Sequence, residues 1–341
     1  MFVSAWVKTH ILPNPHTRTL GYRKDSMTDK LKVGVFGVGS LGQWHARIYS
    51  EMPNVELVGV FDTDPQRARE IADKYRTRPF DRLDELASCV EAASVAAPTD
   101  RHHEVFLKLA NRNCHMLMEK PIAATLQQAR EMVAIAERKN LTLQVGHVER
   151  FNPVIGFLEA NLTTPRFIEA ERLAPFPPAR PGSAPRGTEV SVVLDLMIHD
   201  LDIILHLVRS PLKTLHAVGV AALAPTEDIA NARLVFENGC VANVTASRIS
   251  RERLRKLRVF QEDAYLSLDY MNQSGLLSRK ANRAIETVPV PIEKGDALER
   301  QLASFVDCVQ CRKTPVVCGR QATDALDLAI RICDAIKENP S

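Results

Sequence analysis

The sequence of 341 residues predicts an α/β protein in which a doubly wound parallel sheet is followed by an α+β domain. The length suits two domains. Apolar strands alternate with single helices up to about residue 146, which is typical of right-handed β-α-β units, and beyond that point strands follow one another with turn signals. We predict an N-terminal extension over 1–30, a first domain over 31–148 and a second over 149–341.

In the first domain, two helix starts have clear signals, because Asp64-Pro65 and Thr125 place capping residues before amphipathic stretches. The predicted strands are 32–36, 55–61, 92–97, 115–118 and 141–145, and the predicted helices are 41–50, 64–75, 102–111 and 125–139.

In the second domain, the stretch 173–187 contains five prolines, so it is predicted to be a loop long enough for a lid, an arm or an active-site wall. A turn at 237–239 and the absence of helical patterns over 212–290 predict an antiparallel sheet. Helices are predicted at 153–160, 190–208, 295–312 and 320–337, with a first strand at 166–172.

Composition excludes several classes of function. The chain is 45% hydrophobic and 25% charged, and no apolar run approaches the ~18 residues of a membrane span. The net charge of +3 arises within residues 1–26, so the remainder is neutral and lacks the concentrated basic face that nucleic acid requires. Seven cysteines, an odd number, fit a reducing compartment, and we expect a cytoplasmic protein.

Two local features allow alternatives. Residues 1–26 lack the apolar core of a secretory signal; a transit peptide stays open, but we favour Met27 as the true start. Cys308 and Cys311 form a C-x-x-C motif with Cys318 nearby, but they lie in a helical pattern without histidine. We therefore expect buried thiols and no metal.

The most informative motif is G-x-G-x-x-G at Gly37, Gly39 and Gly42, directly after a strand and at the start of a helix. This arrangement is typical of a Rossmann pyrophosphate-binding loop. Asp62, at the end of the second strand, would bind the adenosine ribose and repel a 2′-phosphate, which favours NAD over NADP. The alternative is a set of glycines that only turn the sheet edge. The cofactor-binding candidates are Gly37, Gly39, Ser40, Leu41, Gly42, Asp62, Pro98, Thr99, His102, Glu119 and Lys120.

Further polar side chains follow strands of the predicted parallel sheet, where ligand crevices form. Thr99 and His102 follow the third strand and could border the nicotinamide, or they could be surface groups. Lys120 ends the fourth strand and is fixed by Pro121, so it can reach the crevice as an acid or base. The alternative is an ordinary surface lysine.

The helix predicted over 190–208 carries Asp195 and His199 four residues apart, with Asp202 extending the same face. Polar groups on so apolar a helix must find partners or line a cavity. A cluster of arginines spans 248–258. If its alternating members at 251, 253 and 255 share one strand face, they could grip a diphosphate, but we favour a solvated or subunit-facing surface.

Together these motifs resemble the Gfo/Idh/MocA oxidoreductase family over residues 31–338. The resemblance implies an open-faced, mainly antiparallel sheet in the second domain and NAD(P)-dependent oxidation or reduction of a sugar or cyclitol hydroxyl. Because an open-faced sheet usually pairs with another surface, we expect a homodimer or homotetramer. It implies catalytic roles for Lys120, Asp195 and His199, with Asp202 contacting substrate.

The stretch 145–153 looks like the branch that acts on UDP-activated amino sugars, which implies oxidation of the 3-hydroxyl of UDP-N-acetylglucosamine or a relative. The chain departs from the family at 189–194, where many members have a glycine-rich run before the catalytic aspartate. The alternatives are an inositol or free-sugar dehydrogenase and a non-catalytic NAD-binding regulator. The substrate-binding candidates are Lys120, His147, Arg150, Asn152, Asp195, His199 and Asp202.

Overall fold

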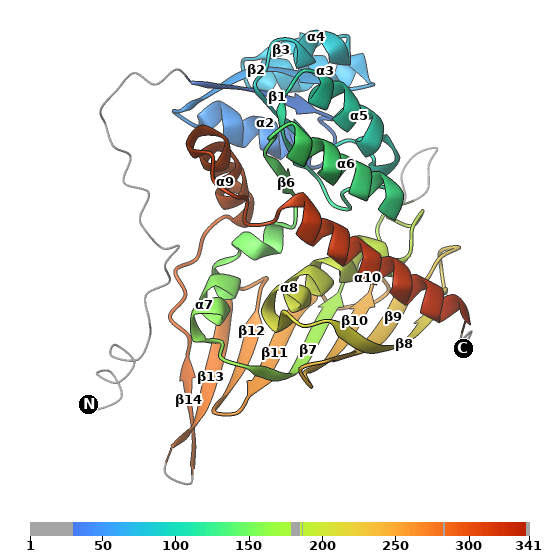
Figure 1. Ribbon diagram of the computed structural model, residues 1–341, viewed down its shortest axis with the longest axis vertical. Helices are drawn as coiled ribbons and strands as arrows, with labels where there is room; N and C mark the ends of the chain where they lie inside the picture. The colour runs from blue at the N-terminus through green and yellow to red at the C-terminus, as the bar shows by residue number, and fades with distance from the viewer. Residues whose placement is uncertain (1–29, 179–184, 186, 282–283, 339–341) are drawn as a thin grey trace. The chain divides into compact units, whose positions relative to one another are not determined.

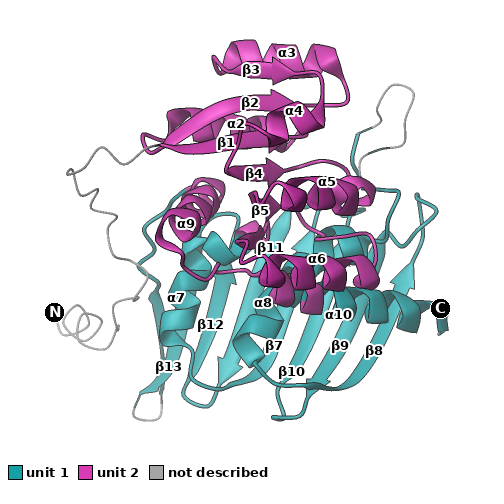
Figure 2. Ribbon diagram, turned by 45° about the horizontal axis from the view of Figure 1, so that its top comes forward, with its two compact units in different colours: residues 1–22, 149–295, 325–341 teal, residues 23–148, 296–324 magenta. Residues whose placement is uncertain are grey.

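The computed structural model in Figure 1 describes residues 30–178, 185, 187–281 and 284–338. These residues form two compact units, coloured separately in Figure 2. Within the described ranges, unit 2 holds 30–148 and 296–324, whereas unit 1 holds 149–295 and 325–338. The sequence assigns all of 149–341 to the second domain, but 296–324 belongs with unit 2. The predicted extension, including Met27, lies outside the described residues except for Lys30.

Unit 2 is built on a six-stranded parallel sheet in the order β3-β2-β1-β4-β5-β6. The strand order reverses between β1 and β4, which is the switch point where such sheets bind ligands. The doubly wound prediction is therefore confirmed. The elements are β1 Leu31–Phe36, α2 Gly42–Glu51, β2 Val55–Phe61, α3 Pro65–Lys74, β3 Arg78–Phe80, α4 Leu83–Ala87, β4 Ala92–Val95, α5 Thr99–Asn111, β5 His115–Met118, α6 Leu126–Arg138, β6 Leu143–Val145 and α9 Ala297–Cys311.

Local signals account for most of these elements. The carboxylate of Asp64 caps α3 by accepting the N–H groups of Gln66 and Arg67, and the Thr125 hydroxyl caps α6. The short β3 and α4 were not predicted. Helix α9 belongs here because Leu302 and its buried neighbours on α9 pack in the same apolar cluster as the first strand.

Unit 1 contains an eight-stranded sheet in the order β14-β13-β12-β11-β7-β10-β9-β8. Neighbouring strands are antiparallel except β7 and β10, which run parallel, so the predicted mainly antiparallel sheet is confirmed. The elements are a 3-10 turn Val148–Phe151 that begins at the unit boundary, α7 Pro153–Asn161, β7 Pro165–Leu173, a π-helical turn Val193–Met197, α8 Ile198–Val208, β8 Leu212–Val220, β9 Ile229–Phe236, β10 Val241–Ser247, β11 Leu254–Gln261, β12 Ala264–Asp269, β13 Ser274–Ala281, β14 Ala284–Pro289 and α10 Gly319–Glu338, of which 325–338 count with unit 1.

The core of unit 1 lies between one face of this sheet and helices α7, α8 and α10 (Figure 1). On β7, Ile168 and Ala170 point into that core, and Arg172 shares their face. The helix predicted from residue 190 begins only at Val193, as a π turn. This departure changes the geometry of Asp195, because a π turn does not keep the spacing of an α-helix.

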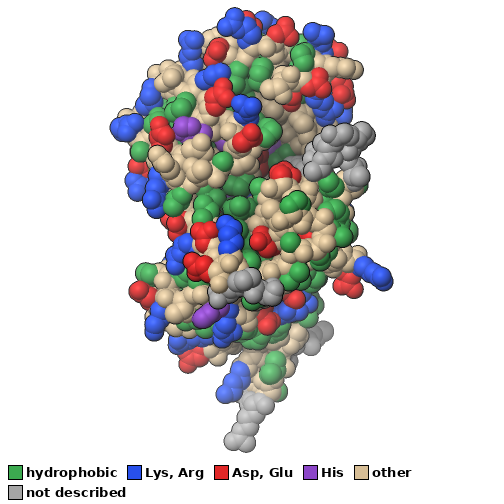
Figure 3. Space-filling model, turned by 90° about the vertical axis from the view of Figure 1, so that its right-hand side faces the viewer, with side chains coloured by type: hydrophobic (Ala, Val, Ile, Leu, Met, Phe, Trp, Pro, Cys, Tyr) green, Lys and Arg blue, Asp and Glu red, His purple; other side chains and the backbone are tan. Residues whose placement is uncertain are grey.

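The surface of the described residues is mixed in charge. On the face shown in Figure 3, basic and acidic side chains are interspersed rather than gathered by sign. None of the helices in the described ranges is long and apolar enough to span a membrane.

Cys308 is buried as predicted, but Cys311 is exposed, so the prediction of buried thiols is wrong for Cys311.

Candidate active site

The glycine loop of unit 2 has the geometry of a pyrophosphate cradle. Gly37 adopts a φ of +86°, and a Cβ there would lie 2.8 Å from the backbone of Ala96. A Cβ on Gly42 would lie 1.8 Å from the Gly37 carbonyl oxygen, so only glycine lets α2 approach the strand this closely. A Cβ on Gly39 would meet nothing within 4 Å, which leaves open space beside the backbone for a ligand. The loop therefore fits a dinucleotide.

Asp62 lies against this loop, as its position after β2 predicts. Its Oδ2 accepts the backbone N–H of Val38 at 2.7 Å, and its Oδ1 accepts the N–H of Asp64 at 3.0 Å. Arg67 donates from Nε to the Val38 carbonyl oxygen at 3.0 Å. The carboxylate is thus fixed beside the glycine loop, where a ribose hydroxyl of a bound dinucleotide can reach it.

His102 is a brace between two loops. It is buried at 1% exposure, with Nε2 2.9 Å from the Ala97 carbonyl oxygen and Nδ1 2.9 Å from the Pro121 carbonyl oxygen. Burial lowers the pKa of this imidazole despite the carbonyl neighbours, which favour its charged form. His102 therefore ties the loop after β4 to the segment that carries Lys120.

Helix α5 already begins at Thr99, three residues before the predicted start, and Pro98 is its N-cap residue.

Glu119 and Lys120 follow β5. Lys120 is partly exposed, whereas Glu119 is buried with its Oε1 3.4 Å from His45 Nε2. His45 Nδ1 contacts the buried Ser94 hydroxyl at 2.7 Å. A Cβ on Gly146 would lie 2.5 Å from Glu119 Oε1, so the lack of a side chain there leaves room for the carboxylate. The sequence did not predict a role for His45, although a histidine three residues after the glycine motif, on the buried face of α2, is an available signal.

In unit 1, Asp195 and His199 lie on one continuous helical segment, Asp195 within the π turn and His199 in the first turn of α8. Both are partly exposed. Ser191 accepts the backbone N–H of Val193 with its hydroxyl and that of Asp195 with its carbonyl oxygen, which starts the turn. π turns are frequent at functional sites because they re-aim side chains.

The other substrate-binding candidates are buried. Arg150 and Asp202 form a pair, with Nη1 and Oδ2 3.5 Å apart and both side chains 2% exposed. Asn152 caps α7 and donates to the Tyr270 carbonyl oxygen at 3.1 Å. His147, which belongs to unit 2, is 1% exposed.

A buried ionic network next to His199 was not predicted. Arg172 on β7 makes a two-pronged contact with Asp200, at 2.7 Å from Nε and 3.1 Å from Nη2. Its Nη1 lies 3.1 Å from Glu149 Oε1, which also accepts from Arg255 at 3.1 Å. Burial raises the pKa of Asp200 in spite of Arg172, whereas for Glu149 the two arginines outweigh burial and lower the pKa.

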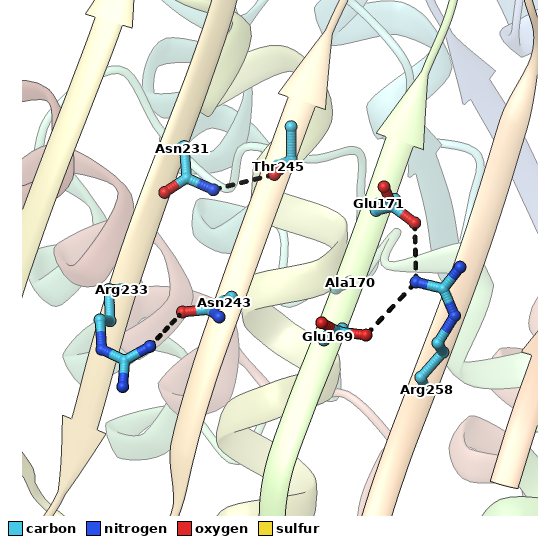
Figure 4. Close-up of a pocket in the computed structure, with 8 residues that line it drawn as sticks. All are labelled: Glu169, Ala170, Glu171, Asn231, Arg233, Asn243, Thr245 and Arg258. Atoms are coloured by element: carbon cyan, nitrogen blue, oxygen red, sulfur yellow. Dashed lines mark hydrogen bonds and ion pairs between the residues drawn. The ribbon is translucent and has the colours of Figure 1, made fainter.

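Arg251, Arg253 and Arg255 do not share a strand, so the condition for a diphosphate grip is not met. Only Arg255 lies on β11, since Arg251 and Arg253 precede its start at Leu254. Arg258 points to the opposite face and contacts Glu169 at 3.3 Å and Glu171 at 3.0 Å. Figure 4 shows the polar side chains that line a pocket on this face and pair with one another: Glu169, Glu171, Asn231, Arg233, Asn243, Thr245 and Arg258. Both carboxylates of this face contact Arg258, and Arg233 donates to Asn243 at 3.1 Å, which suits a solvated or partner-facing surface.

Comparison with known proteins extends this description. Residues 31–147 match the family described as "Oxidoreductase family, NAD-binding Rossmann fold", and residues 159–267 match the "GFO/IDH/MocA C-terminal domain". The chain is 36% identical over 315 residues to a UDP-N-acetylglucosamine 3-dehydrogenase of Acidithiobacillus ferrooxidans, covering 90% of this chain and 97% of that protein. It is 22% identical to scyllo-inositol 2-dehydrogenase (NAD(+)) of Bacillus subtilis over 91% of this chain and 95% of that one.

A solved structure of the Acidithiobacillus ferrooxidans UDP-N-acetylglucosamine 3-dehydrogenase GnnA superposes with a TM-score of 0.85 at 34% identity, covering 91% of this chain and 99% of that one. A Clostridium difficile dehydrogenase, MviM, shares the fold with a TM-score of 0.77 at 21% identity, covering 89% and 99%. With a cradle that fits NAD and matches that cover both units, the chain belongs to the Gfo/Idh/MocA family of NAD-binding oxidoreductases.

Proposed function

We propose that this oxidoreductase transfers a hydride from C3 of UDP-N-acetylglucosamine, or of a related UDP-amino sugar, to NAD. The observation that carries the proposal is the 36% identity over nearly the whole chain with a UDP-N-acetylglucosamine 3-dehydrogenase. The scyllo-inositol enzyme is similar over a comparable length, but at 22% identity its likeness supports the fold rather than the substrate.

The chain's own residues would handle the proton of the reacting hydroxyl. In the proposed reaction, His199 takes the proton from the sugar 3-hydroxyl and Asp195 orients the imidazole. Lys120 hydrogen-bonds the same oxygen and shares the proton. The glycine loop and Asp62 would hold NAD, which would supply the acceptor for the hydride that leaves the carbon. Keto-sugar and NADH are the products.

The test is an NADH-absorbance assay of the full chain with NAD and four separate substrates: UDP-N-acetylglucosamine, free N-acetylglucosamine, its 1-phosphate and myo-inositol. Glutamate and a 3-aminotransferase that consumes the keto-sugar pull the equilibrium forward. We expect turnover that depends on the UDP group. Turnover of inositol with none on the UDP sugar would overturn the proposal, and NAD binding without turnover on any substrate would favour a regulator.

Asp62 is expected to set the preference for NAD. Asp62→Asn keeps an oxygen that can accept the Val38 N–H but removes the charge that repels a 2′-phosphate. A charged hydrogen bond is worth about 1.5–3 kcal/mol, so the ratio of kcat/KM for NADP to that for NAD should rise at least about tenfold. Steady-state kinetics with both cofactors measure this. Asp64→Asn is the matched control, because Asp64 caps α3 and its substitution should leave the ratio unchanged.

We further propose a cytoplasmic homodimer or homotetramer. The polar face of the eight-stranded sheet, with its mutually paired side chains, supports a surface that another copy of the chain can cover. Light scattering coupled to size-exclusion chromatography measures this state, and a monomer at all concentrations would contradict it.

A further inference from the structure

Residues 187–192 lead into the π turn, and Gly187 lies close to the carboxylate of Asp195. Gly187 adopts a φ of +83°, and a Cβ built on it would lie 2.5 Å from Asp195 Oδ2. Any other residue at position 187 would therefore strain the backbone and push the carboxylate away. The space open to the Asp195 carboxylate therefore depends on where the backbone of Gly187 lies.

A buried guanidinium fixes that backbone. Arg248, 2% exposed, donates from Nη1 to the carbonyl oxygens of Gly187 at 2.5 Å and Val190 at 2.8 Å. Its Nε donates to Asp228 Oδ1 at 2.7 Å, and its Nη2 donates to the Thr226 hydroxyl at 2.9 Å. One planar group thus holds two carbonyls of the segment in a fixed relation.

Arg248 is held by Asp228, and both carboxylate oxygens of Asp228 accept hydrogen bonds. Asp228 is fully buried, and its Oδ2 accepts three consecutive backbone N–H groups, from residues 222–224, at 2.6–2.9 Å. Burial alone would raise the pKa of Asp228, but these hydrogen bonds and Arg248 lower it to about 2, so the group is anionic at neutral pH. Thr226 adds a hydrogen bond from its hydroxyl to the Val190 carbonyl oxygen at 2.8 Å.

We propose that Arg248, anchored on Asp228, is a positioning residue that sets the carboxylate of Asp195 through the backbone of Gly187. The inference rests on the proposed catalytic role of Asp195. Arg248 then has a role different from the rest of the arginine cluster. Its guanidinium group binds the carbonyl oxygens of Gly187 and Val190, which precede Asp195 in the chain, and not the substrate.

Two glycine substitutions distinguish the effect of backbone strain on kcat from the effect of a Cβ that contacts Asp195. Gly187→Ala and Gly239→Ala both place alanine at a φ near +82°, but a Cβ on Gly239 would meet nothing within 4 Å. We expect Gly187→Ala to lower kcat about 10- to 100-fold, since small displacements of catalytic groups cost this much. Gly239→Ala should melt at a similarly reduced temperature and keep its kcat, and neither should change the NAD dissociation constant.

A double-mutant cycle with Asp195→Ala then tests the route of the effect. If Gly187 acts through the carboxylate, Gly187→Ala has no further effect on kcat once Asp195 is alanine; an equal fractional loss in both backgrounds overturns the proposal. Arg248→Lys, which keeps the charge beside Asp228 but loses the fork, should lower kcat in the same direction with NAD binding unchanged.

Crystal structures of Gly187→Ala, Arg248→Lys and Gly239→Ala provide a readout that does not need the substrate. The first two should show the Asp195 carboxylate displaced and the third should show it in place. An unmoved carboxylate in all three variants overturns the positioning role. Failure of the wild-type chain to oxidise UDP-N-acetylglucosamine, with the carboxylate displaced as expected, would instead overturn only the proposed function.

Discussion

Replacing Lys120 by alanine is expected to lower kcat by about 10²–10⁴-fold, the usual contribution of a well-placed acid or base. The dissociation constant for NAD should change far less than kcat, because the glycine loop and Asp62 would hold most of the dinucleotide, and Lys120, itself a cofactor-binding candidate, lies on a different loop, after β5. Stopped-flow single turnovers with the UDP sugar measure the chemical step, and calorimetry measures NAD binding.

Two further variants sharpen this result. Lys120→Arg keeps a positive charge, but a guanidinium does not release its proton in proteins, so it should lose nearly as much turnover as alanine. Lys108→Ala removes a lysine of the same unit that pairs with Glu104 on α5 at 3.3 Å, and it should turn over like the wild type. A near-normal rate for Lys120→Ala would remove Lys120 from the mechanism.

The parts of the fold that follow from the sequence are those with local signals. The strands β2 and β5 have the predicted bounds, because each is an apolar run between clear turn residues. The glycine loop is equally local, since its spacing and the flanking strand and helix define its role. β3 and α4 were missed because three and five residues are too short to show a period.

The parts that could not be predicted depend on long-range contacts. Arg172 interrupts an alternating strand and looks like a surface residue, yet its partners Asp200 and Glu149 lie 28 and 23 positions away. Arg248 likewise looks like one member of a basic cluster until Asp228 and Gly187 are seen beside it. The π turn at Asp195 leaves no mark in the hydrophobic period, so the sequence predicts α-helical spacing between Asp195 and His199 where the structure has a π turn.

The second large effect is expected at Arg172. Arg172→Met keeps most of the side chain's volume but leaves Asp200 and Glu149 buried without their shared guanidinium, while Arg255, whose side chain is 49% exposed, still contacts Glu149. Removing one partner of a buried ionic contact costs about 3–5 kcal/mol. For a unit of this size the melting temperature should fall by about 6–20 °C. Thermal unfolding followed by circular dichroism measures the shift.

Arg331→Met is the matched control, because Arg331 in the same unit is 51% exposed and contacts Asp327 at 3.9 Å, and an exposed pair contributes at most about 1 kcal/mol. A melting temperature for Arg172→Met equal to that of the control would mean that the two carboxylates find other compensation.

The position of Asp200 next to His199 gives the network a second consequence. When Asp200 loses its two-pronged contact, the first turn of α8 loses its tie to β7, so kcat should fall even at temperatures where the variant remains folded.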